Sequence, residues 1–255
     1  MWQFWKKQSV VHDPKDVSHI GEYLEEYYDF LTEENLEIGL FLRDAVAGVK
    51  GRFPVIKVLD AGCGPTMLYW AAFMDAADEY HGLDAREDHV DYVKSQSKES
   101  LPPRLLDLCE EMALRQAAST SAHAYYAALC SKLRTMTVHD MNFAWPYEEG
   151  TFPVIMSAFG LECIESMDKL VDGIREVYRL LPKNGRFIFV TIAETDYWKI
   201  GDTTLRCLDV NAKVLEEAAR KAGFKNIHVE TRAATTALER RQGYETMVFG
   251  YADKL

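Results

Sequence analysis

The stretch Val58-Leu59-Asp60-Ala61-Gly62-Cys63-Gly64-Pro65-Thr66 decides the fold of this 255-residue chain. An apolar strand runs into two glycines, and a helix is expected to follow at once, because proline suits the first helical position. Glycine lets the backbone turn sharply and lets a ligand approach without a Cβ in the way. This order of elements predicts an α/β protein that binds a small ligand beyond the carboxyl end of the strand.

Strands and helices alternate around this glycine loop. Short β-branched or apolar runs predict strands, and apolar residues spaced three or four apart predict the helices between them. We expect strands at 55–59, 79–83, 135–139, 154–157, 186–192, 226–230 and 244–251, and helices at 67–77, 88–97, 167–181 and 214–222. This alternation predicts a mostly parallel sheet with helices on both faces.

The whole chain, 1–255, is expected to form a single domain, because α/β domains often reach about 250 residues. Residues 1–50 are predicted to form a helical lid, and 51–255 the core of the domain. A helical insertion is expected at about 98–134, where an Ala-rich stretch interrupts the alternation.

The composition narrows the classes of function. The chain has 29 basic and 40 acidic residues and a net charge of −11, which disfavours binding to nucleic acid, since basic residues supply most of that affinity. No stretch approaches the roughly 20 apolar residues of a membrane helix, and the first residues lack the apolar core of a signal peptide. The five cysteines form no CxxC pair. We therefore expect a cytoplasmic protein without zinc or disulfides, a monomer or weak dimer that binds neither nucleic acid nor membrane.

The spacing of acids around the glycine loop points to the ligand. Asp84 follows the next predicted strand, where a carboxylate can accept hydrogen bonds from both hydroxyls of a ribose. A dinucleotide site needs a third glycine near Met67, which is absent, and Asp60 would repel a pyrophosphate. The pattern favours S-adenosylmethionine, which carries a sulfonium and an ammonium. A dinucleotide, or an ordinary strand–turn–helix with no ligand, remains an alternative reading of these residues.

Several motifs together resemble one family. The chain is similar to the class I S-adenosylmethionine-dependent methyltransferases that include the nicotinamide, phenylethanolamine, indolethylamine and thioether methyltransferases. The resemblance covers nearly the whole length. It rests on the glycine loop, and on Tyr23-Leu24-Glu25-Glu26-Tyr27-Tyr28, Ser157-Ala158-Phe159-Gly160-Leu161-Glu162 and Glu194-Thr195-Asp196-Tyr197-Trp198-Lys199-Ile200-Gly201. It implies a Rossmann-like fold with a seven-stranded sheet.

The resemblance also implies which residues hold the cofactor. The tyrosines near the start of the chain close over it, the glycine loop wraps its methionine part, one acid binds the ribose, and a second group contacts the adenine. The matching positions are Tyr23, Tyr28, Asp60, Gly62, Cys63, Gly64, Thr66, Asp84, His89, Asp140, Met141 and Ser157. By its position alone, Asp140 is better explained as a turn or cap residue, and it is the resemblance that favours an adenine contact.

The predicted reaction is methyl transfer to the nitrogen of a small amine. Glu162 and Glu194 match two acids near the methyl-accepting nitrogen in the phenylethanolamine branch. A carboxylate can bind an ammonium and accept the proton that must leave before the nitrogen attacks. Aromatic faces attract cations, which suggests Phe159, Tyr197 and Trp198 as the substrate slot.

Two departures from the family pattern limit what is implied about the substrate. Trp198 stands where the nicotinamide branch has an aromatic hydroxyl, and an acid of the phenylethanolamine branch is missing at about 242–243. A pyridine nitrogen, an oxygen or a sulfur as the methyl acceptor, or a cofactor-binding scaffold without activity, remain alternatives. Other acids near the start of the chain, namely Glu22, Glu25 and Glu26, are expected to be solvated surface.

Overall fold

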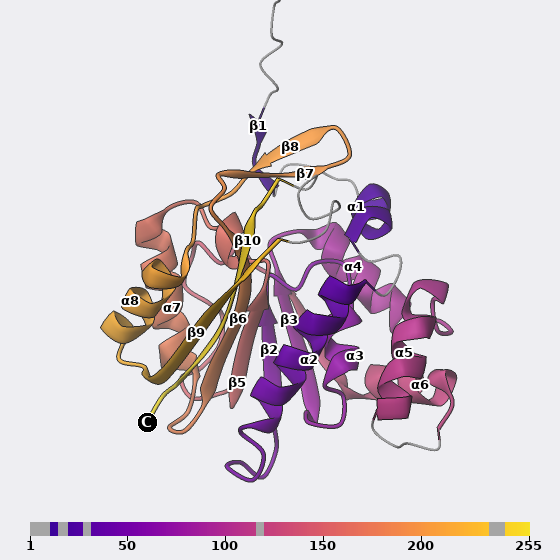
Figure 1. Ribbon diagram of the computed structural model, residues 1–255. Helices are drawn as coiled ribbons and strands as arrows, with labels where there is room; N and C mark the ends of the chain where they lie inside the picture. Colours follow the sequence, from indigo (N-terminus) through magenta and orange to yellow (C-terminus); the bar gives the residue numbers. More distant parts are fainter. Residues whose placement is uncertain (1–10, 15–19, 28–31, 116–119, 235–242) are drawn as a thin grey trace, which may run out of the picture.

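The computed structural model describes residues 11–14, 20–27, 32–115, 120–234 and 243–255 of the chain. Its centre is a seven-stranded sheet (Figure 1), whose order is β4 (Leu133–Val138), β3 (Glu79–Asp84), β2 (Lys57–Ala61), β5 (Val154–Ala158), β6 (Arg186–Ala193), β10 (Thr246–Asp253) and β9 (Lys225–Ala233). Only β10 runs antiparallel to its neighbours, β6 and β9. The predicted Rossmann-like fold with a mostly parallel sheet is confirmed.

Helices cover both faces of the sheet because successive strand residues point to opposite sides. In β2, Val58 belongs to one buried cluster and Leu59 to the other. The first cluster lies under α2 (Glu33–Ala47), α3 (Leu68–Ala72), α4 (Glu87–Gln96), α5 (Pro103–Arg115) and α6 (Ala122–Lys132). The second lies under α7 (Met167–Leu180) and α8 (Ala212–Ala222), on the other face of the sheet in Figure 1.

The segment predicted as a lid divides into two parts. Helix α2 begins at its N-cap Thr32, whose side chain accepts a hydrogen bond from the backbone N–H of Asn35. Its residues Ile38, Leu42 and Val46 are fully buried, and the helix packs on α3 and β6, so it is part of the core layer. Of the described elements of this segment, α1 (Ile20–Tyr27) and the strand β1 (Val11–His12) lie at the upper end of the sheet in Figure 1.

A second, three-stranded sheet lies above the first, and the sequence did not predict it. Strands β7 (Tyr197–Ile200) and β8 (Thr203–Arg206) form a hairpin that turns at Gly201, and β1 pairs with β8 in parallel. Gly201 has a φ of +53°, which suits a tight hairpin turn. Arg206 joins the layers, because its guanidinium donates to Asp13 at 2.8 Å and to the carbonyl of Ile164 at 3.2 Å.

The helix after the glycine loop is shorter than predicted. It spans only Leu68–Ala72, since the chain tightens at Phe73, whose N–H bonds to the carbonyl of Trp70 three residues earlier. The expected insertion consists of α5 and α6, which pack on each other and on α3. Tyr125 anchors it, because its hydroxyl donates to the carbonyl of Ala71 at 2.6 Å.

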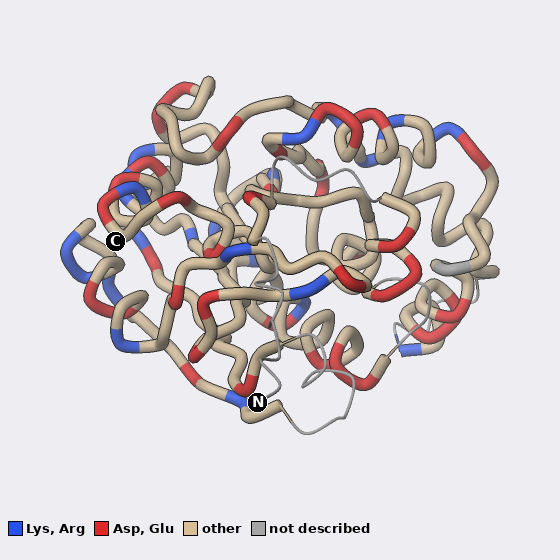
Figure 2. The backbone as a smooth tube through the Cα atoms, turned by 90° about the horizontal axis from the view of Figure 1, so that it is seen from above, with Lys and Arg blue, Asp and Glu red and all other residues tan. Residues whose placement is uncertain are grey.

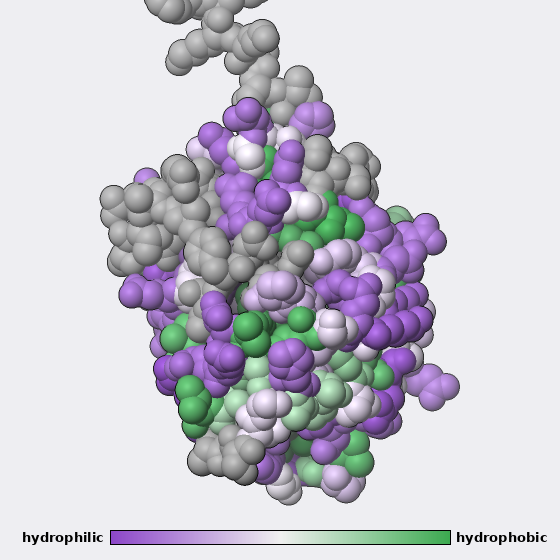
Figure 3. Space-filling view, turned by 90° about the vertical axis from the view of Figure 1, so that its right-hand side faces the viewer, coloured by the Kyte–Doolittle hydropathy of each residue, from purple (hydrophilic) through white to green (hydrophobic). Residues whose placement is uncertain are grey.

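The described surface carries its charges in a mixed pattern. Seen from above, acidic and basic residues alternate around the outline of the molecule (Figure 2). On the side that Figure 3 shows, apolar residues appear among hydrophilic ones in small, separate groups. In the part of the chain that the structure describes, no helix is long and apolar enough to cross a bilayer.

Candidate active site

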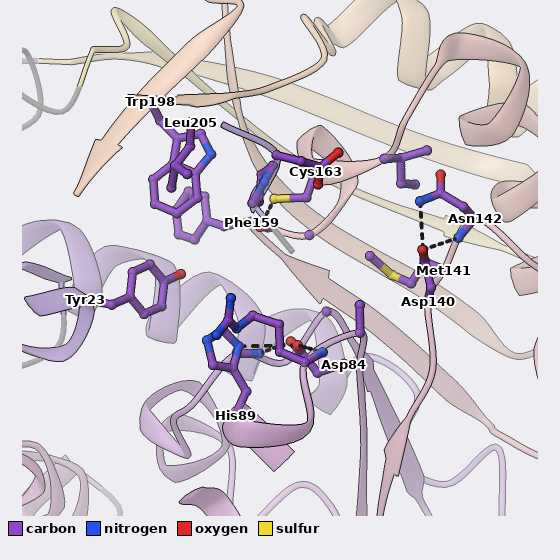
Figure 4. Close-up of a pocket in the computed structure, with 18 of the residues that line it drawn as sticks. Tyr23, Asp84, His89, Asp140, Met141, Asn142, Phe159, Cys163, Trp198 and Leu205 are labelled. Atoms are coloured by element: carbon purple, nitrogen blue, oxygen red, sulfur yellow. Dashed lines mark hydrogen bonds and ion pairs between the residues drawn. The ribbon is translucent and has the colours of Figure 1, made fainter. Parts of the chain in front are cut away.

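A large hollow opens beyond the carboxyl ends of β2, β3 and β5, at the place that the glycine loop predicts. Its volume, mouth included, is about 860 Å³, in the range of small-ligand sites. Seven of the residues predicted to bind the cofactor line it (Figure 4), namely Tyr23, Gly62, Gly64, Asp84, His89, Asp140 and Met141.

The two glycines of the loop are required by its geometry. Gly62 has a φ of +75° and Gly64 a φ of +62°, a region that other residues rarely adopt. A Cβ on Gly62 would come within 3.0 Å of both the Cα of Gly160 and the terminal methyl of Met141. The loop therefore brings bare backbone to the wall of the hollow, where a ligand can lie against it.

Asp84, at the end of β3, is held in place by backbone donors. Its Oδ2 accepts from the N–H of Gly64 and its Oδ1 from the N–H of Arg86, both at 2.9 Å. His89 Nδ1 lies 3.2 Å from Oδ1, and the His89 ring stacks on Tyr23 with centroids 6.0 Å apart. The carboxylate thus has a fixed position on the wall, with an aromatic pair from α1 and α4 above it.

The opposite wall comes from the loop after β4. Asp140 and Met141 line the hollow, and Asp140 Oδ1 accepts from the backbone and side-chain nitrogens of Asn142 at 2.9 and 2.7 Å. These residues suit an adenosine, because Asp84 could accept from ribose hydroxyls, Asp140 could accept from the amino group of the base, and the thioether of Met141 offers an apolar contact. The N–H groups of Gly62 and Cys63 donate to the carbonyl of Leu83 and that of Gly64 to Asp84, so what the glycine loop offers the methionine part is space free of a Cβ.

Four of the predicted cofactor residues do not reach the wall. Asp60 is 3% exposed and accepts a hydrogen bond from the indole N–H of Trp70 at 2.7 Å, so it supports the loop from behind. Burial raises the pKa of Asp60 to about 7. The side chains of Cys63, Thr66 and Ser157 are also buried behind the wall; the Ser157 hydroxyl donates to the carbonyl of Ala61 at 2.7 Å. Tyr28 lies outside the described residues.

A second hollow adjoins the first. Three aromatic residues, Tyr23, Phe159 and Trp198, line both hollows and therefore mark the boundary between them. The rest of the second lining is Glu26, Tyr27, Thr32, Glu34, Asn35, Tyr69, Glu162, Ile192 and Tyr244. Three of these side chains are carboxylic acids, and none of the described lining residues is Lys, Arg or His.

Glu162 lies deep in the wall of the second hollow. It stands in η2 (Leu161–Cys163), a single turn after β5, and only 2% of it is exposed. Burial raises its pKa to about 7, although the hydroxyl of Thr191, which donates to Oε2 at 2.8 Å, and nearby backbone groups favour the charged form. A carboxyl group with such a pKa exchanges a proton readily near neutral pH.

Glu194 and Tyr197, which the sequence predicted as site residues, lie outside both hollows. Neither residue lines the two hollows. Glu194 has a φ of +60° at the end of β6, and its carboxylate accepts from the hydroxyl of Thr246 on β10 at 2.6 Å. Tyr197 is 38% exposed and packs beside Gly243 on the outer side of the hairpin. The alternating direction of strand side chains explains this, since its neighbour Trp198 points inward.

Several residues of the second hollow were not predicted as site residues. Glu26 was expected to be solvated, but it lines the hollow, and its Oε2 accepts from the N–H of Gly201 at 2.7 Å. Asn35 and Tyr69 reach it from α2 and α3 and bond to each other at 3.0 Å. The helical spacing of Tyr23, Glu26 and Tyr27 places them on one face of α1, and this was the signal that could have identified Glu26.

The fold and the hollow beyond the glycine loop fit a protein that binds S-adenosylmethionine, and a family match assigns the chain to the class I S-adenosylmethionine-dependent methyltransferases. The family model of the NNMT/PNMT/TEMT family matches residues 12–255, nearly the whole chain. The chain therefore belongs to the NNMT/PNMT/TEMT family. No curated protein matches the chain.

Solved structures share the fold at low sequence identity. A methyltransferase from Methanosarcina mazei superposes with a TM-score of 0.56 at 13% identity, over 78% of this chain and 92% of that one. The magnesium protoporphyrin IX methyltransferase of Synechocystis with bound S-adenosylmethionine gives 0.53 at 14% identity, over 91% and 89%. The cyclase SpnF gives 0.53 at 16% identity, over 84% and 80%. Because a cyclase shares the fold, the family match is what assigns methyl transfer.

Proposed function

We propose that the protein transfers a methyl group to the nitrogen of a small amine bound in the second hollow. The observation that carries this proposal is Glu162, a buried carboxyl group on a wall next to the boundary with the cofactor hollow. The acidic lining favours a positively charged ligand, and the aromatic faces of Phe159 and Trp198 also attract cations. We further propose a cytoplasmic monomer or weak dimer, in keeping with five free cysteines.

When bound, S-adenosylmethionine supplies the methyl group on a positively charged sulfur. Glu162 binds the protonated amine and accepts its proton, which frees the nitrogen lone pair. A pKa near 7 suits this task, because the group is charged often enough to take the proton and can release it afterwards. Tyr23, Phe159 and Trp198 orient the amine at the boundary and keep water out, and such positioning can supply about 7–11 kcal/mol.

In this reaction the nitrogen–carbon bond forms as the carbon–sulfur bond breaks, and the electron pair of that bond remains on sulfur. The product is a methylated amine and S-adenosylhomocysteine. We assign Glu194 a supporting role, because its carboxylate bonds to Thr246 and does not line either hollow. This role differs from the direct contact that the sequence predicted.

A panel of primary and secondary amines, pyridines, alcohols and thiols tests the proposal, with mass spectrometry of the methylated product. We expect amines to be methylated, and Glu162→Gln to lower their turnover about 100-fold or more while leaving cofactor affinity close to normal. Glu165→Gln, in an exposed residue of the same loop, is the matched control. Methylation of pyridines alone, with no effect of Glu162→Gln, would refute the role of Glu162. Cofactor binding without turnover of any acceptor would favour a scaffold.

A further inference from the structure

The indole nitrogen of Trp198 is a buried donor at the boundary between the two hollows. Within the part of the chain that the structure describes, Trp198 Nε1 is buried and has no hydrogen-bond partner. An indole N–H can only donate, and a buried tryptophan normally finds an acceptor. Since Trp198 lines both hollows, a molecule bound in one of them is the natural source of that acceptor.

The surroundings of Trp198 fix the direction of its ring. Tyr23 and Tyr27 of α1 pack against it edge to face, with centroids 5.8 and 5.9 Å away and interplanar angles of 61° and 78°. The Tyr27 hydroxyl also donates to the carbonyl of Lys199, the next residue of β7. In Figure 4 the indole nitrogen lies on the edge of the ring that is turned away from Tyr23. The donor is therefore positioned before any ligand binds.

The chemistry at the boundary indicates which molecule supplies the acceptor. In the proposed reaction a bound cofactor would present its sulfonium and methyl group at this boundary, and neither of these accepts a hydrogen bond. The lone pair of the reacting nitrogen is directed at the methyl carbon, so it cannot serve either. A carboxylate on the substrate is disfavoured, because Glu26 and Glu162 line the same hollow. An uncharged oxygen of the substrate meets all these conditions.

We propose that the Nε1–H of Trp198 is a specificity determinant that donates a hydrogen bond to an uncharged oxygen, a hydroxyl or carbonyl, carried by the amine substrate. This inference rests on the proposed function, because it requires an amine in the second hollow. An amine that lacks the oxygen leaves the buried N–H without a partner, and sites of this kind reject such analogues. We expect a preference of about 10- to 100-fold in kcat/KM for the oxygen-bearing member of a matched pair.

The kinetic test compares Trp198→Phe with the unaltered protein on matched acceptors: an alkylamine, the amino alcohol of equal length and the corresponding amino ketone. Phenylalanine keeps an aromatic face but removes the donor. We expect the variant to lose the preference for oxygen-bearing acceptors, largely through their kcat/KM. The matched control is Tyr27→Phe, which removes a hydroxyl that already bonds to Lys199 and should affect all three acceptors alike. If Trp198→Phe lowers all three equally, the inference is wrong.

A binding measurement on the unaltered protein tests the same contact without turnover. The indole ¹H–¹⁵N resonance of Trp198, assigned through the backbone, is followed in the complex with S-adenosylhomocysteine. We expect it to move downfield when the amino alcohol or amino ketone is added, and to stay in place with the alkylamine. A downfield shift caused by S-adenosylhomocysteine alone would show that the cofactor, and not the substrate, accepts the hydrogen bond of Trp198, and would overturn the inference. A shift with the amino alcohol, but no methylation of any amine, would refute the proposed function and leave the contact standing.

Discussion

Replacing Glu162 by glutamine should make the protein more stable while it removes most activity. The side chain is 2% exposed, and burial raises the pKa of Glu162 from 4.5 to about 7. Because the pKa of the folded state lies above that of the unfolded chain, ionisation opposes folding. The stability contributed by this group is complete below about pH 4.5 and is lost as the pH rises to about 7.

The size of the effect follows from the two pKa values. Their difference, at about 1.4 kcal/mol per pH unit, corresponds to about 3 kcal/mol of lost stability above pH 7. Glutamine carries no charge, so it avoids this loss. Its amide nitrogen, however, takes the place of one carboxylate oxygen that accepts from Thr191 or from the backbone, and losing that hydrogen bond costs about 1 kcal/mol. The remaining gain of about 2 kcal/mol raises the melting temperature by about 4–8 °C for a chain of this size.

Thermal unfolding of both proteins at pH 5 and pH 8 tests this reasoning, with activity measured on the same preparations. Glu162→Gln should melt higher at pH 8, and the advantage should disappear near pH 5, where Glu162 is protonated. Asp253→Asn is a control of opposite sign. Burial alone would raise the pKa of Asp253, but the hydrogen bond and the charge of Arg186 outweigh it, so the net pKa lies below the ordinary value. Neutralising Asp253 should therefore destabilise the protein. A glutamine variant that is no more stable than the original at pH 8 would refute the reasoning.

Three further predictions concern the cofactor hollow and its surroundings. Asp84→Ala should weaken cofactor binding about 100-fold in calorimetry, since two ribose hydroxyls lose a charged acceptor; unchanged affinity would exclude that contact. Gly62→Ala should lower both cofactor affinity and melting temperature, because its Cβ meets Met141 and Gly160 at 3.0 Å and its φ is +75°; normal behaviour in both assays would contradict this. Glu194→Gln should reduce kcat less than Glu162→Gln does, and an equal loss would restore a direct role for Glu194.

The sequence predicted the parts of the protein that depend on local pattern. The glycine loop, Asp84 on the next strand and the alternation of elements all lie where their motifs place them. The hairpin of β7 and β8 was missed, because 197–206 is short, polar and interrupted by Gly201, so its pairing depends on long-range contacts with α1 and β1.

The side-chain directions at the site were harder to predict. Asp60 belongs to the glycine-loop motif, but its carboxylate turns inward to Trp70, ten residues later on α3. Tyr69 and Tyr244 reach the second hollow from segments that carry no motif, so only the packed structure brings them together. Motifs thus located the cofactor hollow and part of the second one, through Phe159, Glu162 and Trp198, while the rest of the second lining comes together only through tertiary packing.

The small sheet of β1, β8 and β7, which lines the first hollow through Trp198, Ile200 and Leu205, has a consequence for the exchange of ligands. Strand β1 pairs with β8 across almost the whole length of the chain, and among the described residues 11–14 the contacts include this pairing of Val11 and His12 and the ion pair of Asp13 with Arg206. Both residues of β1 are exposed, so we expect this pairing to open at a free energy below that of global unfolding. Opening leaves the seven-stranded sheet intact. Entry and release of ligands then need only this local opening, and we expect the exchange rate to depend on how firmly β1 is held on β8.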